Sequence, residues 1–186
     1  MHGLSMFRNN HTIQLLMPIS IPNSMQMPKL KYTLRFAMPQ DIDEIIKMCQ
    51  EHANYEKAVY YPEGKGKQLE QHLFHSTPTL YCTIAEGEQG ILAYTTYMKE
   101  FSTWEADYYL HMDCLFVRES ARNQGIGLAM IQKMISHAVE LNIRLFQWQT
   151  PEFNTRAIEF YHRLGAHSKK KLRMYLDLEN FLYKNK

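Results

Sequence analysis

The chain has 186 residues, of which 45% are hydrophobic and 12% aromatic, and its formal net charge is +2. This length and composition predict one domain with a substantial core and exclude an intrinsically disordered chain. The small net charge argues against a dedicated nucleic-acid-binding protein, which usually carries a basic stripe. Three widely spaced cysteines without a CxxC pair predict neither a disulfide framework nor a zinc site, and they favour a cytoplasmic protein. No apolar stretch approaches the roughly 20 residues of a transmembrane helix, so no membrane partner is expected.

The first 28 residues differ in composition from the rest of the chain. They are rich in Met, Asn, Ser and Pro and show no clear period. We interpret residues 1–28 as an N-terminal extension of unclear role. Residues 29–186 form the predicted domain.

The first half of this domain predicts a strand, two helices and a hairpin. Alternation with period two predicts a strand over residues 31–37. Residues 38–56 carry a proline and two aspartates at the start of a helical apolar stripe, which is typical of a helix N-terminus. A looser helix is expected over residues 67–74. The sequence "EGEQG" predicts the turn of a hairpin over residues 79–98.

The second half alternates strands with helices. The largely apolar run 107–117 predicts a central strand, and residues 128–142 repeat apolar side chains at helical spacing. A strand is expected over 143–150, a helix capped by Asn154 and stopped by Gly165 follows, and a last strand is expected over 170–178. The order β-α-α-β-β-β-α-β-α-β predicts an α/β sheet with helices on its faces.

The stretch "RNQGIG", Arg122 to Gly127, stands between the central strand and the following helix. The first turn of a helix presents unpaired N–H groups and the positive end of the dipole, which together favour a phosphate. Gly125 permits a backbone angle that other residues resist, and Gly127 lets a ligand approach the backbone closely. A tight strand-to-helix turn without any ligand is the alternative. Met130 replaces the third glycine of a Rossmann fingerprint, and a Walker loop is excluded because no GK[ST] follows.

Two motifs resemble those of the GCN5-related N-acetyltransferase (GNAT) family. "LFVRESARNQGIGLAMIQKM" is similar to the acyl-CoA pyrophosphate loop, Q/R-x-x-G-x-G/A, and "NTRAIEFYHRLGA" resembles the second family signature. "EHANYEK" and "FSTWEADYYLHMDCLFV" resemble the diamine branch, the spermidine/spermine or thialysine N-acetyltransferases. The resemblance implies the GNAT fold, a central mixed and mostly antiparallel twisted sheet with helices on both faces. It also implies acetyl-CoA as co-substrate, no metal, and a homodimer.

The resemblance further implies which residues contact acetyl-CoA. They belong to the splayed central strand, the loop and the last helix: Leu115, Phe116, Val117, Arg122, Asn123, Gln124, Gly125, Ile126, Gly127, Leu128, Asn154 and Arg163. Backbone N–H groups near Leu115 to Val117 are expected to meet the oxyanion.

Acyl transfer to an amine needs a neutral amine, and at pH 7 only about one primary amine in a thousand is neutral. Asp113, in the strand before the loop, is the candidate base. Along a regular strand its side chain is expected on the face opposite to that of Cys114. A second role stays open for Asp113, as a ligand of the substrate ammonium or of a backbone amide.

Tyr161 lies on the apolar face of the last predicted helix. Core packing is one interpretation, and the resemblance implies the other, a general acid for the CoA thiolate. A cysteine nucleophile at Cys114 is disfavoured because no histidine stands at a pairing position. A metal site from His111, Asp113 and Cys114 is disfavoured because these side chains are not expected to converge.

The acceptor amine is predicted to meet Glu51, Trp104 and Asp113. Other carboxylates expected in a cation groove are Glu56, Glu105 and Asp107. The basic run "HSKKKLR" and residues Ser102 and Cys114 depart from the diamine enzymes. We therefore predict transfer of an acetyl group to a primary amine of a small diamine, polyamine or amino-acid-like molecule by direct transfer. A protein or peptide N-acetyltransferase and a non-catalytic acyl-CoA sensor are the alternatives.

Overall fold

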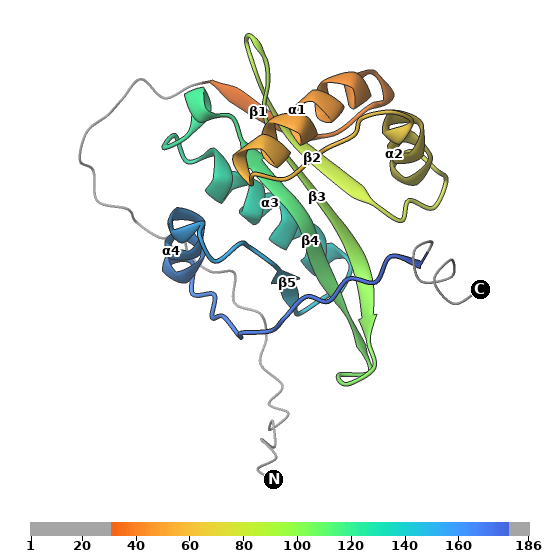
Figure 1. Ribbon diagram of the computed structural model, residues 1–186, viewed down its shortest axis with the longest axis vertical. Coiled ribbons are helices and arrows are strands. Elements are labelled where there is room, and N and C mark those ends of the chain that lie inside the picture. The colour runs from red at the N-terminus through yellow and green to blue at the C-terminus, as the bar shows by residue number, and fades with distance from the viewer. Residues whose placement is uncertain (1–30, 179–186) are drawn as a thin grey trace.

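The protein folds around one five-stranded sheet, which a computed structural model describes for residues 31–178 (Figure 1). The strands follow the order β1-β2-β3-β4-β5; the first three pairs are antiparallel and β4 pairs with β5 in parallel. The strands are β1 (Tyr32–Phe36), β2 (Tyr81–Gly87), β3 (Gly90–Ser102), β4 (Asp107–Val117) and β5 (Phe146–Trp148). The α-helices are α1 (Ile42–Tyr55), α2 (Lys65–Leu73), α3 (Ile126–Glu140) and α4 (Thr155–Arg163).

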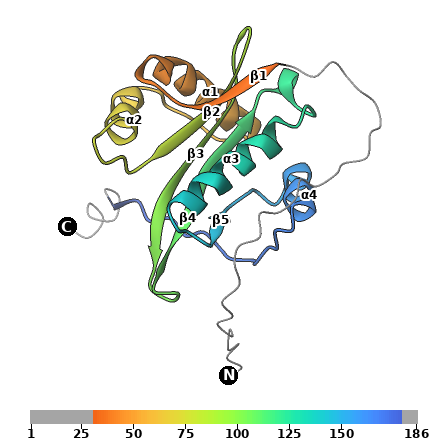
Figure 2. The ribbon, with the colours of Figure 1, turned by 180° about the vertical axis from the view of Figure 1, so that it is seen from behind.

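Helices cover both faces of the sheet. Helices α1 and α2 lie on one face, and α3 and α4 lie on the other, as the two opposite views show (Figures 1 and 2). Side chains of β2 alternate between the two layers: Cys82 and Ile84 pack with α1, whereas Ala85 packs with α3. Tyr161 of α4 packs with Met134 of α3 in the same layer. The predicted mixed, mostly antiparallel sheet with helices on both faces is confirmed.

A buried ion pair fixes the start of α1 against β1. Asp41, only 6% exposed, accepts hydrogen bonds from Arg35 Nη1 at 2.6 Å and from the Met38 N–H at 2.7 Å. Arg35 also donates from Nε to Glu86 of β2. These bonds attach the start of α1 to β1 and β2, and they fix the direction of the helix relative to the sheet.

The parallel strands β4 and β5 form a fork. They pair over three positions, and the last of these joins Met112 to Trp148. Strand β5 ends there, whereas β4 continues to Val117. The pairing of β3 with β4 shifts register at the same level, because Thr96 faces Cys114 and Tyr97 faces Met112. Asp113 is therefore the extra residue of a β-bulge at the root of the fork.

Most predicted elements are confirmed, with Asn154 capping α4 and Gly165 ending it at a φ of +88°. The predicted strand over residues 170–178 is wrong: this segment pairs with no strand of the sheet, and Leu172 is 90% exposed. An alternating pattern becomes a strand only where a neighbouring strand supplies hydrogen bonds, and the edge strand β5 offers three residues. The predicted extension 1–28 lies outside the described residues.

Candidate active site

The loop between β4 and α3 presents an uncapped helix start. Gly125 is the N-cap of α3 with a φ of +80°, and no side chain caps the first turn. Asn123 is also left-handed, with a φ of +63°. By helix geometry the N–H groups of residues 126–128 lack helical partners. The loop therefore combines free donors with the positive end of a 15-residue helix, an arrangement that suits an anion.

The fold itself does not require a glycine at position 127. A Cβ built on Gly127 would lie 3.7 Å from Phe160 Cζ, which is an ordinary van der Waals distance, and its φ is not in the left-handed region. Gly125 differs, because its backbone conformation is one that L side chains rarely adopt. The absence of a side chain at 127 thus leaves the N–H groups of the first turn open to a ligand.

Two arginines border this loop. Arg122 donates from Nε to the carbonyl of Val117 at 2.9 Å, and its guanidinium lies 4.6 Å above the ring of Tyr55. Arg156, in the first turn of α4, donates from Nη2 to Asn123 Oδ1 at 2.5 Å. Arg122 was predicted to contact the cofactor and Arg156 was not. Arg156 can be recognised as part of this site only from the fold, which brings the first turn of α4 against Asn123.

Backbone donors of β4 face the open side of the fork. The Val117 carbonyl accepts from Arg122, whereas the Cys114 carbonyl accepts from Thr95 of β3 at 2.7 Å. Because backbone groups alternate sides along a strand, the N–H groups of Leu115 and Val117 point into the fork and that of Phe116 points toward β3. Of the three predicted residues, Leu115 and Val117 therefore present donors to the fork, whereas the Phe116 side chain packs in the core beside α1.

Asp113 is exposed at the root of the fork, at the bulge. The expectation that Asp113 and Cys114 occupy opposite faces is wrong, since Cys114 Sγ lies 3.6 Å from Asp113 Oδ2. The bulge breaks the strict alternation on which that expectation depended. Burial raises the pKa of the Cys114 thiol to about 12, so a thiolate nucleophile is disfavoured at neutral pH. Within residues 31–178 no group of three His, Cys, Asp or Glu side chains is arranged to hold a metal.

Tyr161 packs at the same fork. Its ring lies 4.8 Å from that of Trp148, the last residue of β5, and only 8% of the residue is exposed. Burial first, and then the charge of Glu56, raise the pKa of Tyr161 to about 12. The hydroxyl therefore stays protonated at neutral pH and is able to donate.

The end of α1 lies against both the fork and the start of α4. Asn154 Oδ1 accepts from the Ala157 N–H and from the Tyr55 hydroxyl, each at 3.3 Å. His52 stacks on Phe116 with 5.2 Å between ring centroids. The sequence motif that contains His52 was noted for its family resemblance, but nothing in it indicated that this imidazole would pack on the forked strand.

Other predicted residues lie apart from this centre. Glu51 forms an ion pair with Arg118, which donates to it from Nε at 3.0 Å and from Nη2 at 2.7 Å. Trp104 is 95% exposed in the β3–β4 turn, about 20 Å from Asp113 at 3.3 Å per strand residue. Arg163 is exposed in the last turn of α4. Glu105 belongs to the same exposed turn as Trp104, and Asp107 is the exposed first residue of β4 after that turn.

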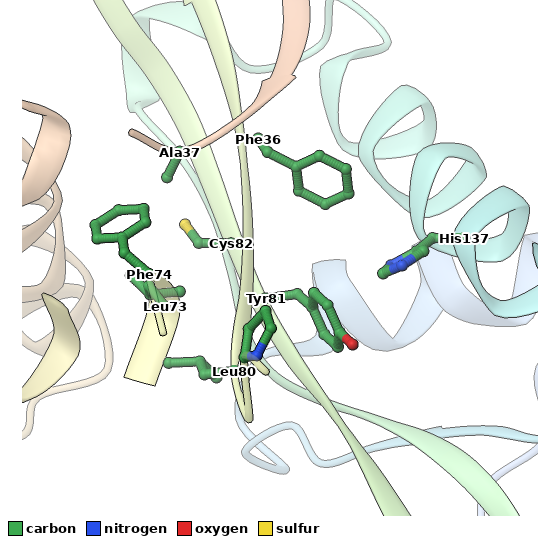
Figure 3. A pocket seen from close by; sticks show the side chains of 9 residues that line it. Phe36, Ala37, Leu73, Phe74, Leu80, Tyr81, Cys82 and His137 are labelled. Carbon is green, nitrogen blue, oxygen red and sulfur yellow. The ribbon is translucent and has the colours of Figure 1, made fainter. Parts of the chain in front are cut away.

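A separate cavity opens at the opposite edge of the sheet (Figure 3). It has a volume of about 250 Å³ and lies where β1 ends beside α2 and β2. Its lining is mostly apolar: Phe36, Ala37, Leu73, Phe74, Pro78, Leu80, Tyr81, Cys82 and His137. None of these side chains is a carboxylate, so the cavity does not suit a cationic amine.

Comparisons with known proteins relate the chain to acetyltransferases. The sequence model of the Acetyltransferase (GNAT) family matches residues 40–166. The thialysine N-epsilon-acetyltransferase of Bos taurus is 29% identical over 141 residues, which is 72% of this chain and 82% of that protein. The D-amino-acid N-acetyltransferase of Saccharomyces cerevisiae is 26% identical over 136 residues, covering 72% and 84% of the two chains.

A solved structure shares the fold. The crystal structure of a possible acetyltransferase from Clostridium difficile 630 superposes with a TM-score of 0.67 at 18% identity, covering 78% of this chain and 97% of that one. At this identity the likeness concerns the fold alone. No helix within residues 31–178 is both long and apolar enough to span a bilayer.

Proposed function

Since the chain belongs to the GNAT family of acetyltransferases, we propose that it transfers an acetyl group from acetyl-CoA to a primary amine of a small molecule. One observation carries this proposal: the uncapped start of α3 opens beside the fork that holds Asp113 and Tyr161. An anion-binding helix start next to a carboxylate and a protonated hydroxyl suits a phosphorylated acyl donor and a cationic acceptor.

Acetyl-CoA would bind from the loop into the fork. The N–H groups of residues 126–128 and the Arg122 guanidinium suit the diphosphate. The N–H groups of Leu115 and Val117 suit the pantetheine amide and the thioester oxygen, which becomes an oxyanion during transfer. Asn154 is engaged as the α4 cap and as the partner of Tyr55, so any contact with the cofactor comes in addition to those bonds.

The acceptor would carry at least one ammonium group. Asp113 at the bulge and Glu56 just after α1 are carboxylates that do not pair with Arg118, which binds Glu44 and Glu51 instead. Relatives are named for thialysine and D-amino-acid acetylation. An amino acid or a short diamine is therefore our proposed acceptor class, ahead of a long polyamine.

Transfer would proceed directly within a ternary complex. The neutral amine attacks the thioester carbon, the tetrahedral oxyanion forms at the fork donors, and its collapse expels the CoA thiolate. Tyr161, protonated at neutral pH, gives its proton to that thiolate. The buried Cys114 thiol takes no part in this route.

Release of free CoA thiol across a panel of amino acids, diamines, polyamines and lysine peptides tests the proposal. We expect turnover with small amines bearing a carboxylate or a second ammonium. Turnover with peptides alone would favour a protein N-acetyltransferase. Tight acetyl-CoA binding without thiol release from any acceptor would favour a sensor.

We further propose that the protein acts as a homodimer in the cytoplasm. Exposed apolar side chains support a second copy, since Trp104 is 95%, Leu172 90% and Met174 83% exposed. The three cysteines are free, which suits a reducing compartment. Light scattering after size exclusion should give about twice the chain mass of 22.1 kDa, and a monomer at all concentrations would contradict the dimer.

A further inference from the structure

His52 occupies an enclosed position in the last turns of α1. Its side chain is 14% exposed and its ring stacks on Phe116 at an interplanar angle of 24°. Nδ1 lies 3.3 Å from the Tyr94 hydroxyl, and Nε2 lies 3.4 Å from Glu56 Oε1. The imidazole is thus held between a buried phenol and a half-exposed carboxylate, directly against the strand that forms the fork.

Charged groups face this imidazole from three elements. Glu56 follows the end of α1, one turn after His52, and the charges of Asp113 in β4 and Arg122 in the loop before α3 also act on the ring. Burial is the largest influence and lowers the pKa of His52, with Arg122 acting in the same direction; the two carboxylates oppose this shift. At pH 7 the ring is neutral and keeps one nitrogen lone pair.

We propose that His52 receives the proton that the acceptor ammonium loses before attack, that Glu56 stabilises the resulting imidazolium, and that Asp113 binds the ammonium. This assignment rests on the proposed acetyl transfer. It answers the question that the exposed position of Asp113 leaves open, since a solvent-exposed carboxylate suits binding of an ammonium, whereas a neutral imidazole suits acceptance of its proton.

The proton balance closes without another reactant. The ammonium R–NH₃⁺ gives one proton to the neutral imidazole, which becomes an imidazolium beside the Glu56 carboxylate. The free lone pair then forms the C–N bond, the C–S bond breaks, and the thiolate takes the Tyr161 proton. As the amide forms, the attacking nitrogen loses its second proton, which returns through solvent to the Tyr161 phenolate and restores the phenol. The imidazolium returns its proton to solvent along the exposed side of Glu56, whose side chain is 34% exposed.

The chain provides a matched control histidine. His137 of α3 also contacts a tyrosine hydroxyl, with Nδ1 3.0 Å from Tyr97 OH, and burial lowers its pKa as well. It lines the separate cavity at the other edge of the sheet. Among residues 31–178, a partly buried histidine within hydrogen-bonding distance of a tyrosine hydroxyl thus occurs at both His52 and His137, and His52 packs on the fork.

The pH dependence of kcat/KM in His52→Gln tests the proposal. In the wild type and in His137→Gln we expect a plateau between about pH 7 and pH 9, because the enzyme deprotonates the ammonium. In His52→Gln productive attack needs the rare neutral amine, so kcat/KM should rise nearly tenfold per pH unit. The defect should be about 10²- to 10³-fold at pH 7 and should shrink toward pH 9.

Further measurements separate this role from a structural one and from the proposed function. Acetyl-CoA affinity should be unchanged in His52→Gln, and imidazole added to His52→Ala should restore part of the rate. A preserved plateau in His52→Gln, with an active wild type, would overturn the role of His52 alone. Absence of wild-type turnover with every amine would instead overturn acetyl transfer. In the full chain labelled at histidine nitrogen, Glu56→Gln should lower the pKa of His52, and an unchanged value would remove Glu56 from the assignment.

Discussion

The Tyr55 hydroxyl donates to Asn154 Oδ1 at 3.3 Å and so joins the end of α1 to the start of α4. The same tyrosine ring lies beneath the Arg122 guanidinium. Tyr55 thus contacts both Asn154, which lies 99 positions further along the chain, and Arg122 of the loop before α3. The contacts of Tyr55 therefore connect the proposed diphosphate site at the start of α3 with the proposed reaction centre at the fork.

Replacing Tyr55 by Phe removes the bridging hydrogen bond and keeps the ring under Arg122. Because Tyr55 is 40% exposed, we expect a loss of about 2- to 5-fold in CoA affinity by calorimetry. Tyr55→Leu also loses the contact with the guanidinium and should weaken binding further. Equal affinities in all three proteins would show that the bridge does not support the loop.

The two glycines of the loop should respond oppositely to Ala. Gly125→Ala forces a side chain into the left-handed region and should lower the free energy of unfolding by about 1 kcal/mol. Gly127→Ala meets no close atom in the fold and should leave stability nearly unchanged while weakening CoA binding. Urea unfolding and calorimetry on both variants distinguish the effects. Unchanged CoA affinity in Gly127→Ala and in the bulkier Gly127→Val would mean that no ligand approaches this backbone.

Tyr161→Phe should lower kcat by about 10²-fold and leave acetyl-CoA affinity nearly unchanged, because only the proton donor is lost. The phenylalanine ring retains the packing against Trp148. Equilibrium binding of acetyl-CoA and steady-state rates, measured on the same preparation of each protein, give the two quantities to compare. A parallel loss of affinity and rate would indicate that the tyrosine is structural.

The Arg35–Asp41 pair should give stability that depends on pH. The Arg35 guanidinium holds the pKa of Asp41 below its ordinary value, so this contribution is present above about pH 4 and is lost as pH falls through the folded pKa. Asp41→Asn should cost roughly 2 kcal/mol at pH 7 and less at pH 3. Glu86→Gln, which removes a partly exposed carboxylate from the same arginine, should cost less than Asp41→Asn. A pH-independent cost for Asp41→Asn would contradict this account of the anchor.

Features that depend only on a residue and its neighbours in the sequence were predicted correctly. Gly125 lies in a left-handed conformation at the start of a helix, and Asn154 caps α4, as their positions in the sequence indicated. These features needed only the residue type and its neighbours.

Features that depend on tertiary pairing could not be predicted. The bulge at Asp113 arises from the register between β3 and β4, which the sequence of β4 alone does not specify. Glu51 was expected to meet the acceptor, yet it pairs with Arg118, which lies 67 positions away. His52 acquires its lowered pKa from burial against Phe116, a contact between α1 and β4.

The residues of 170–178 illustrate the remaining error. Their alternation is genuine, with Leu172 and Met174 separated by a basic residue, but both side chains lie in solvent. Alternation of apolar side chains shows that a segment can adopt a strand conformation, but the strand forms only where a neighbouring strand supplies hydrogen bonds. The described part of this single chain does not provide one for it.

Calorimetric titration of the folded protein with coenzyme A and, separately, with pantetheine tests the central claim most directly. We expect saturable one-to-one binding of coenzyme A, and affinity at least tenfold lower for pantetheine, which lacks the diphosphate together with the adenosine that it carries. Absence of heat and of any thermal shift with coenzyme A, or equal affinity for the two compounds, would contradict a diphosphate held by the first turn of α3.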